Sequence, residues 1–233
     1  MVNLFRALPL LLLGLPALAP AEPLRVALLG DYRPLSSGAA GPRAASFEAA
    51  LLEAWRPALL PGVVPVDDAA SADVRMGPQP DGLAYYQSEP AALTRTEQGL
   101  DDWQSIQGRT FCVVEHSPFA AHVAQRFQAE ARTYPNAAQA LVGIKRGECE
   151  AVVEDRALLE TVAEQPEWRR YARLLPSMPE LAVTFRVQAR EAERQSALQP
   201  LVDRSVLTRD IQDNWINEVI FQAYVLADTL DCH

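Results

Sequence analysis

The sequence predicts an α/β protein with open, mostly parallel sheets flanked by helices, and three observations lead to this fold class. Short apolar runs at residues 24–29, 63–66 and 110–114 have the length and composition of buried strands. Amphipathic helical patterns alternate with them, at 42–55 and from 118 to 127. The 233-residue chain is long enough for one large domain or two small lobes.

The clearest unit of such a sheet is a helix–strand–helix segment in the second half of the chain. Asn136 can cap a helix whose apolar side chains recur with helical spacing at 137–144, and Gly147 ends that helix after two basic residues. Residues 149–153 form an apolar run typical of a strand buried on both faces. Asp155 stands at the carboxyl end of that strand, where open α/β sheets bind ligands.

The first 21 residues have the pattern of a secretory signal peptide. Arg6 precedes an apolar run at 7–18, and residues 19–21 (Ala-Pro-Ala) offer a small-residue cleavage site. The run is too short for a membrane span, and the missing downstream flank of charge disfavours the alternative of an anchored N-terminus. We therefore expect residues 1–21 to be removed and the protein to be exported to the periplasm.

The acidic composition limits the classes of partner. A formal net charge of −9 argues against nucleic-acid binding, which requires a basic face. The net charge says little about a small ligand, because the charge of a cleft can differ in sign from that of the whole molecule.

Three cysteines, at positions 112, 149 and 232, would lie in an oxidising compartment. We expect Cys149 to pair with Cys232 near the end of the chain. Cys112 lies inside an apolar run, where it is either a buried free thiol or the alternative partner.

The segment 140–155, Ala-Leu-Val-Gly-Ile-Lys-Arg-Gly-Glu-Cys-Glu-Ala-Val-Val-Glu-Asp, resembles the second-lobe segment of bacterial periplasmic solute-binding proteins of the amino-acid type (family 3). The resemblance implies a two-lobed type II binding-protein fold, in which each lobe is an open, mostly parallel sheet flanked by helices. Lobe 1 would comprise residues 22–94 and 184–233, and lobe 2 residues 95–183. The family's final Asp commonly holds the ligand's α-ammonium group, and it maps onto Asp155.

Other stretches match the family in order. Residues 24–35 resemble the opening strand and the cleft wall that follows it, and Tyr85-Tyr86 resembles an aromatic element before the first hinge strand. Residues 181–187 resemble the returning hinge strand. Two helices would follow, at about 188–202 and from 208 onwards, and both would pack on the first lobe.

The first lobe also departs from the family pattern. Only residues 67–71 are available for a helix between the second strand and the third, which we expect at 72–76. The family's Thr-x-x-Arg stretch, whose Arg grips the ligand carboxylate, is replaced by residues 78–82. Arg75 or Arg33 could substitute, although neither sits in the family motif.

Together, the strand ends and the aromatic element give a predicted cleft for a small polar or zwitterionic ligand. Ser117, followed by Pro118, would start a helix whose free N–H groups suit an anionic group. The alternative is that polar residues merely mark where strands leave the core, with Asp155 capping the helix that begins at 156. The predicted ligand-binding residues are Tyr32, Arg33, Arg75, Tyr86, His116, Ser117 and Asp155.

The sequence predicts no metal site and no cofactor, and it does not predict an enzyme. His116 and His122 have the wrong spacing for one helical face, and no nucleophile motif is present. Glu115, Glu154 and Asp155 could serve as acid and base on the same cleft, which keeps an enzyme as a third and weaker reading.

The leading prediction is therefore periplasmic capture of a small, amino-acid-like solute by hinge closure, for an ABC-type importer or a sensor. Its partners would be the solute and a membrane permease, with the protein itself monomeric. The rival prediction is a non-transport interaction protein on a degenerate binding-protein scaffold, for example a partner of a periplasmic dehydrogenase. The departures in the first lobe favour this rival, whereas the segment around Asp155 favours solute binding.

Overall fold

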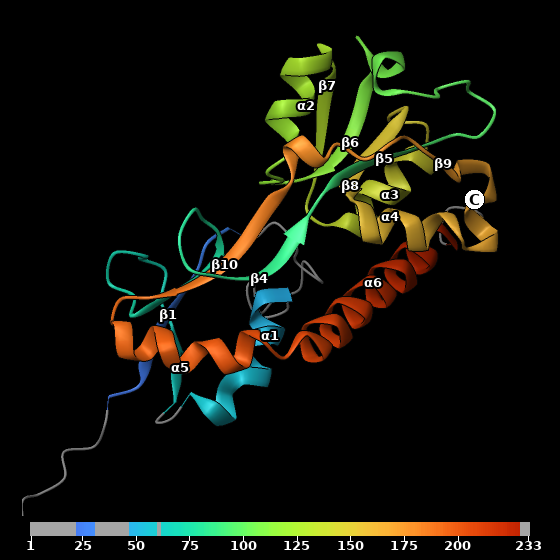
Figure 1. The fold of residues 1–233 in the computed structure, drawn as a ribbon. Coiled ribbons are helices and arrows are strands. Elements are labelled where there is room, and N and C mark those ends of the chain that lie inside the picture. Colours follow the sequence, from blue (N-terminus) through green and yellow to red (C-terminus); the bar gives the residue numbers. More distant parts are fainter. Residues whose placement is uncertain (1–21, 31–46, 60–61, 229–233) are drawn as a thin grey trace, which may run out of the picture.

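The computed structural model describes residues 22–30, 47–59 and 62–228, which form two five-stranded sheets flanked by helices (Figure 1). The first sheet has the order β2-β1-β3-β10-β4, with β1 at Leu24–Leu28, β2 at Val63–Pro65, β3 at Val74–Pro78, β4 at Leu83–Ser88 and β10 at Val183–Ala189. The second has the order β7-β6-β8-β5-β9, with β5 at Pro90–Thr94, β6 at Thr110–Val114, β7 at Glu130–Tyr134, β8 at Ala151–Asp155 and β9 at Arg173–Leu174. The predicted α/β fold class is confirmed.

Each sheet combines three parallel strands with antiparallel neighbours. In the first sheet β2, β1 and β3 are parallel, whereas β10 runs antiparallel to β3 and β4. In the second, β7, β6 and β8 are parallel and β5 runs antiparallel to β8. All five residues of β5 and of β8 are buried, as expected for central strands covered on both faces.

Helices cover both sheets and share the core with the strands. The helices are α1 (Phe47–Trp55), α2 (Ala120–Phe127), α3 (Ala137–Lys145), α4 (Arg156–Ala163), α5 (Ala192–Val202) and α6 (Ser205–Asp228), with 3-10 turns at Arg56–Ala58, Trp103–Ile106, Pro166–Tyr171 and Pro179–Leu181. In the first lobe, Tyr85 lies between Trp55 of α1 and Phe185 of β10, with ring centroids 6.3 and 6.4 Å away. These aromatic contacts fix α1 on the sheet.

Two strands connect the lobes. β4 leads directly into β5 through Glu89, and β10 returns beside β4 with Val183 opposite Ser88. Our sequence-based boundary placed residues 90–94 in lobe 1, but β5 pairs with β8 in the second sheet, so the chain changes sheets at Glu89. Apolar patterning identifies the strand without showing which sheet it joins, because pairing is a long-range choice.

Helix α6 packs against elements of both lobes. It contacts α1 and β4 on one side of the hinge and α3 and α4 on the other, and its second half runs beneath α3 and α4 (Figure 1). Its buried side chains include Trp215, Val219 and Ala223. The expectation that both C-terminal helices pack on the first lobe therefore holds for α5, and for α6 only in part, because α6 packs on both lobes.

One disulfide joins two elements of the second lobe. Cys112 in β6 and Cys149 in the turn before β8 are bonded, with their Cα atoms 5.7 Å apart. The expected bond between Cys149 and Cys232 is therefore wrong; Cys232 lies outside the described residues. The strand pairing decides this, since β6 and β8 are parallel neighbours with Cys112 opposite Val152.

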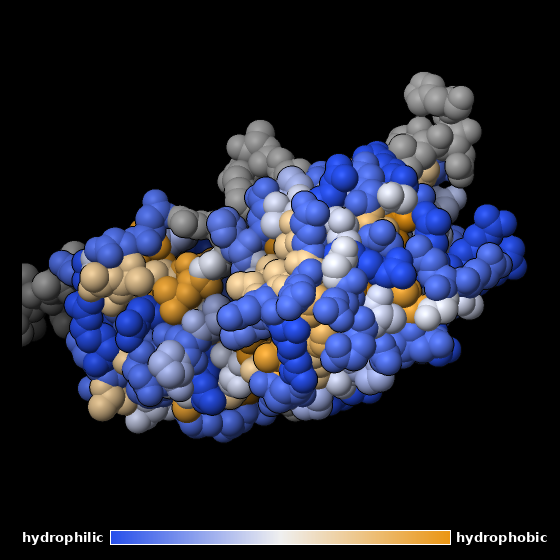
Figure 2. Space-filling model, turned by 90° about the horizontal axis from the view of Figure 1, so that it is seen from above, coloured by the Kyte–Doolittle hydropathy of each residue, from blue (hydrophilic) through white to orange (hydrophobic). Residues whose placement is uncertain are grey.

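On the face shown in Figure 2, hydrophilic side chains cover most of the surface, and apolar side chains gather in a band across the middle and in smaller groups. No helix in the described ranges is long and apolar enough to cross a membrane. The predicted signal peptide falls outside those ranges.

Candidate functional site

The Asp155 carboxylate joins the two lobes at the hinge. Only 1% of the residue is exposed, and its Oδ1 accepts a hydrogen bond of 2.9 Å from the Ala157 backbone N–H, which caps α4. Its Oδ2 accepts a hydrogen bond of 2.7 Å from the Tyr86 hydroxyl and another from the Ser88 hydroxyl. A carboxylate of the second sheet is thus held by two hydroxyls of β4 in the first sheet.

Strand geometry explains why these three side chains meet. Tyr86 and Ser88 are two residues apart on β4, so their side chains share one face of the strand. Pro90 starts the next strand opposite Asp155, which sets β8 beside the end of β4. Tyr86 and Asp155 are both among the candidates from sequence analysis, and the structure brings them together. Sequence analysis missed Ser88, for which the two-residue spacing from Tyr86 was the available signal.

The Asp155 carboxylate has no cationic partner among the described side chains. The adjacent Arg156 turns away and pairs with Glu160 at 2.6 Å and with Glu89 at 3.7 Å. A buried carboxylate is costly unless it is paired, and the three hydrogen bonds offset part of that cost. A cation brought by a ligand would complete the site.

A shallow cavity of about 440 Å³ opens at this point of the hinge. It is lined by Tyr86, Gln87, Glu89, Asp155, Arg156, Ala157, Glu160 and Gln212. Three carboxylates and one guanidinium leave this lining with a net negative charge. Gln212 belongs to α6 and donates a hydrogen bond of 3.3 Å to the Tyr86 hydroxyl, a contribution that sequence analysis also missed.

His116 and Ser117 lie at the same edge of the second sheet as Asp155, because β6 and β8 are parallel neighbours. His116 is exposed in a left-handed conformation with φ of 59°. Ser117 is nearly buried, and its Oγ accepts a hydrogen bond of 3.3 Å from the Phe119 N–H at the start of α2. Neither residue lines the hinge cavity.

Arg75 lies elsewhere. We placed it at the end of the third strand, but β3 begins at Val74, so Arg75 sits at the opposite end, where its guanidinium donates a hydrogen bond to Gln188. The strand starts two residues later than its apolar pattern indicated, because Ala72 and Asp73 belong to the preceding turn. Tyr32 and Arg33, the other predicted residues of the first lobe, fall outside the described residues.

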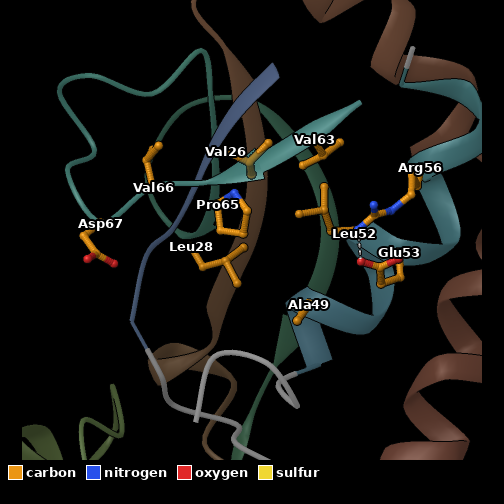
Figure 3. Close-up of a pocket in the computed structure, with 10 residues that line it drawn as sticks. All are labelled: Val26, Leu28, Ala49, Leu52, Glu53, Arg56, Val63, Pro65, Val66 and Asp67. Atoms are coloured by element: carbon orange, nitrogen blue, oxygen red, sulfur yellow. Dashed lines mark hydrogen bonds and ion pairs between the residues drawn. The ribbon is translucent and has the colours of Figure 1, made fainter. Parts of the chain in front are cut away.

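A second cavity, of about 380 Å³, lies inside the first lobe and is mostly apolar. Figure 3 shows Val26, Leu28 and Pro65 around it, between α1 and the edge strand β2. The Glu53–Arg56 ion pair stands on its rim. Within the described ranges, no group of three or more His, Cys, Asp or Glu side chains could hold a metal ion.

Comparison with known proteins bears on the fold. No protein-family model and no curated protein matches the sequence. Among solved structures, the ancestral amino-acid-binding protein AncCDT-1, a precursor of cyclohexadienyl dehydratase, aligns with a TM-score of 0.56 at 16% identity, over 83% of this chain and 95% of its own.

An ancestral arginine-binding protein bound to arginine gives a TM-score of 0.55 at 17% identity, over 82% of this chain and 97% of its own. The GluR0 ligand-binding core in complex with L-glutamate gives a TM-score of 0.53 at 18% identity, over 85% of this chain and 100% of its own. The chain has the two-lobed type II binding-protein fold. At these identities the likeness establishes the fold alone.

Proposed function

We propose that the protein binds a small, amino-acid-like solute at the hinge, with Asp155 receiving the ligand's ammonium group. The observation that carries this proposal is a buried carboxylate, facing a polar cavity, whose described neighbours supply hydroxyl and amide hydrogen bonds but no cation. An ammonium group would neutralise that charge with a charge-assisted hydrogen bond. The setting is periplasmic, and the solute would be delivered to an ABC-type importer or to a sensor.

The fold supports this proposal. Ligands of open α/β sheets bind at the carboxyl ends of strands, where Asp155 stands. Two of the similar structures are described as binding arginine and L-glutamate, which are amino acids. The binding of similar ligands by this chain is our inference from the site.

A thermal-shift screen of the mature protein against amino acids, each paired with its N-acetyl derivative, tests the proposal. A ligand at 100 times its dissociation constant should add about 2.7 kcal/mol of stability. Acetylation removes the ammonium charge, so the acetylated partner of a binding amino acid should give no shift. Equal shifts from both members of a pair would rule out the role of Asp155.

Substitution of Asp155 gives a second, independent readout. Asn can still cap α4 but cannot supply the charge that Tyr86 and Ser88 bond, so Asp155→Asn should lower the free energy of unfolding by about 1.5–3 kcal/mol. The same change should weaken an amine ligand about 10- to 150-fold. Asp102 is the matched control, because its exposed side chain caps a 3-10 turn through Ser105 N–H and Asp102→Asn should be nearly neutral.

A second candidate function is the interaction protein on a degenerate scaffold. It is favoured by α6, which contacts both lobes, and by the hydrogen bonds that already occupy both Asp155 oxygens. Chemical crosslinking of the periplasmic fraction, followed by mass spectrometry, would test it. A specific protein partner, together with no response to any amino acid, would move the conclusion to this second function.

A further inference from the structure

Arg75 shares a cavity on the first lobe with a second arginine, well away from the hinge site in sequence and in sheet position. The cavity measures about 300 Å³, at the lower end of the range for small-molecule sites. Its lining consists of Ala69, Ala70, Ala72, Asp73, Arg75, Gln188, Ala189 and Arg190. Four alanines line the cavity with small side chains. The polar side chains come from β3, from β10 and from the residues directly before β3 and after β10.

Both guanidinium groups are held in place by neighbours. Arg75 donates to the Gln188 side-chain oxygen, and Arg190 donates through Nη2 to the Ala70 carbonyl oxygen. The Arg190 backbone N–H also donates to the Asp73 carbonyl oxygen at 2.8 Å, which ties this end of β10 to the turn. A guanidinium has five N–H donors, so most of the donors of each remain for a ligand.

The one carboxylate in the lining is already engaged. Asp73 accepts hydrogen bonds from the Arg25 backbone N–H at 3.0 Å and from the Arg25 guanidinium at 3.2 and 3.3 Å. The Arg25 guanidinium lowers the pKa of the Asp73 carboxyl, which stays ionised and neutralises Arg25 rather than the two arginines in the cavity. Nearby, Arg194 is paired with Glu191 at 3.5 Å.

The cavity lining thus carries two guanidinium groups and one carboxylate, in a protein whose formal net charge is −9. We propose that Arg75 and Arg190 form a binding site for a small oxyanion, with the guanidinium groups donating to its oxygen atoms. Guanidinium forks match carboxylate and phosphate oxygens in geometry, and fixing their orientation beforehand reduces the entropy lost on binding. The ligand chemistry is shared by phosphate and by carboxylates, and the site is separate from the amine site at Asp155.

Calorimetric titration with inorganic phosphate, and separately with succinate, tests the site, with sodium chloride keeping the ionic strength constant. At least one anion should bind the wild-type protein. The anion that binds shows whether the site takes a phosphate or a carboxylate. Arg75→Gln and Arg190→Gln should each weaken binding about tenfold or more, since each removes a charge-assisted donor. Both residues are exposed, so unchanged melting temperatures without anion will show that the variants fold.

Two controls make the result specific. Arg126→Gln removes an exposed arginine of the second lobe that pairs with Glu180 at 2.6 Å, and it should leave anion binding unchanged. Asp155→Asn should also leave it unchanged, so failure of the amine site and failure of this site are distinguishable. The proposal is overturned if neither anion binds, or if the Arg75→Gln/Arg190→Gln double variant binds as tightly as wild type.

Discussion

Tyr134 lies between a carboxylate and the disulfide of the second lobe. Its hydroxyl donates a hydrogen bond to Glu148 Oε2 and stands 3.5 Å from the Cys112 sulfur. Burial, and then the neighbouring Glu148 carboxylate, raise the pKa of Tyr134 from 10.0 to about 12. Both causes disfavour the phenolate, so the residue reports on the packing around the disulfide.

This shift predicts a loss of stability in alkali. As the pH rises from 10 towards about 12, Tyr134 loses its proton in the unfolded chain but keeps it in the folded protein. The unfolded state then binds fewer protons than the folded state, so the free energy of unfolding falls as the pH rises through this window. Below pH 10, the stabilising contribution of Tyr134 is fully present. Urea unfolding of wild type and Tyr134→Phe across this range should give a shallower decline in the variant, and parallel declines would contradict the assignment.

At the scale of single elements, α3 shows how a glycine can be required inside a helix. The helix begins after Asn136, whose side chain accepts a hydrogen bond of 2.9 Å from the Gln139 N–H, and it packs on β6. A Cβ atom at Gly143 would stand 2.5 Å from the Tyr134 hydroxyl and 2.7 Å from the Cys112 sulfur. The close approach of helix and disulfide therefore depends on the missing side chain.

Gly143→Ala should destabilise the protein, although helix propensity alone would favour alanine at this position. Alanine favours a helix over glycine by about 1 kcal/mol, whereas overpacking a core costs about 1–3 kcal/mol, and the contact distances here place the cost above the gain. Denaturant unfolding measures the difference. Removing the hydroxyl with Tyr134→Phe should recover part of the loss in the double variant, and a stabilised Gly143→Ala protein would show that α3 can move away from β6.

At the scale of the whole molecule, α6 governs how the two lobes can move. Its 24 residues span about 36 Å at the usual rise per residue, enough to reach from one lobe to the other. Because it contacts α1 and β4 as well as α3 and α4, a rotation of one lobe must break one of these sets of contacts. Hinge closure of the kind common in two-lobed binding proteins is therefore restrained here.

A charge buried under α6 should release this restraint. Ala223 is fully buried in the second half of the helix, so Ala223→Asp introduces an unpaired carboxylate that the contact cannot accommodate. Small-angle scattering should show a larger radius of gyration while circular dichroism keeps the helical signal. Asn217→Asp on the exposed side of α6 is the control, and an unchanged radius in Ala223→Asp would mean that α6 does not hold the lobes together.

The sequence by itself determined the local elements and their type. Apolar periodicity and capping placed the helix at 137–144 within one residue of α3, and short apolar runs located β1, β2 and β6. The resemblance around Asp155 gave the two-lobed fold, which the solved structures confirm. These features were readable because hydrogen-bonding period and side-chain alternation are properties of neighbouring residues.

Only the tertiary structure decided which elements meet. The disulfide joins Cys112 to Cys149 because β6 and β8 are neighbours in the sheet, and Arg75 lies far from Asp155 because β3 starts at Val74. The helix from residue 208 onwards was predicted from the sequence, but its packing partner in the second lobe was not. An apolar face requires burial without specifying its partner, because the hydrophobic effect is not directional, and that choice rests on the packing of the complete chain.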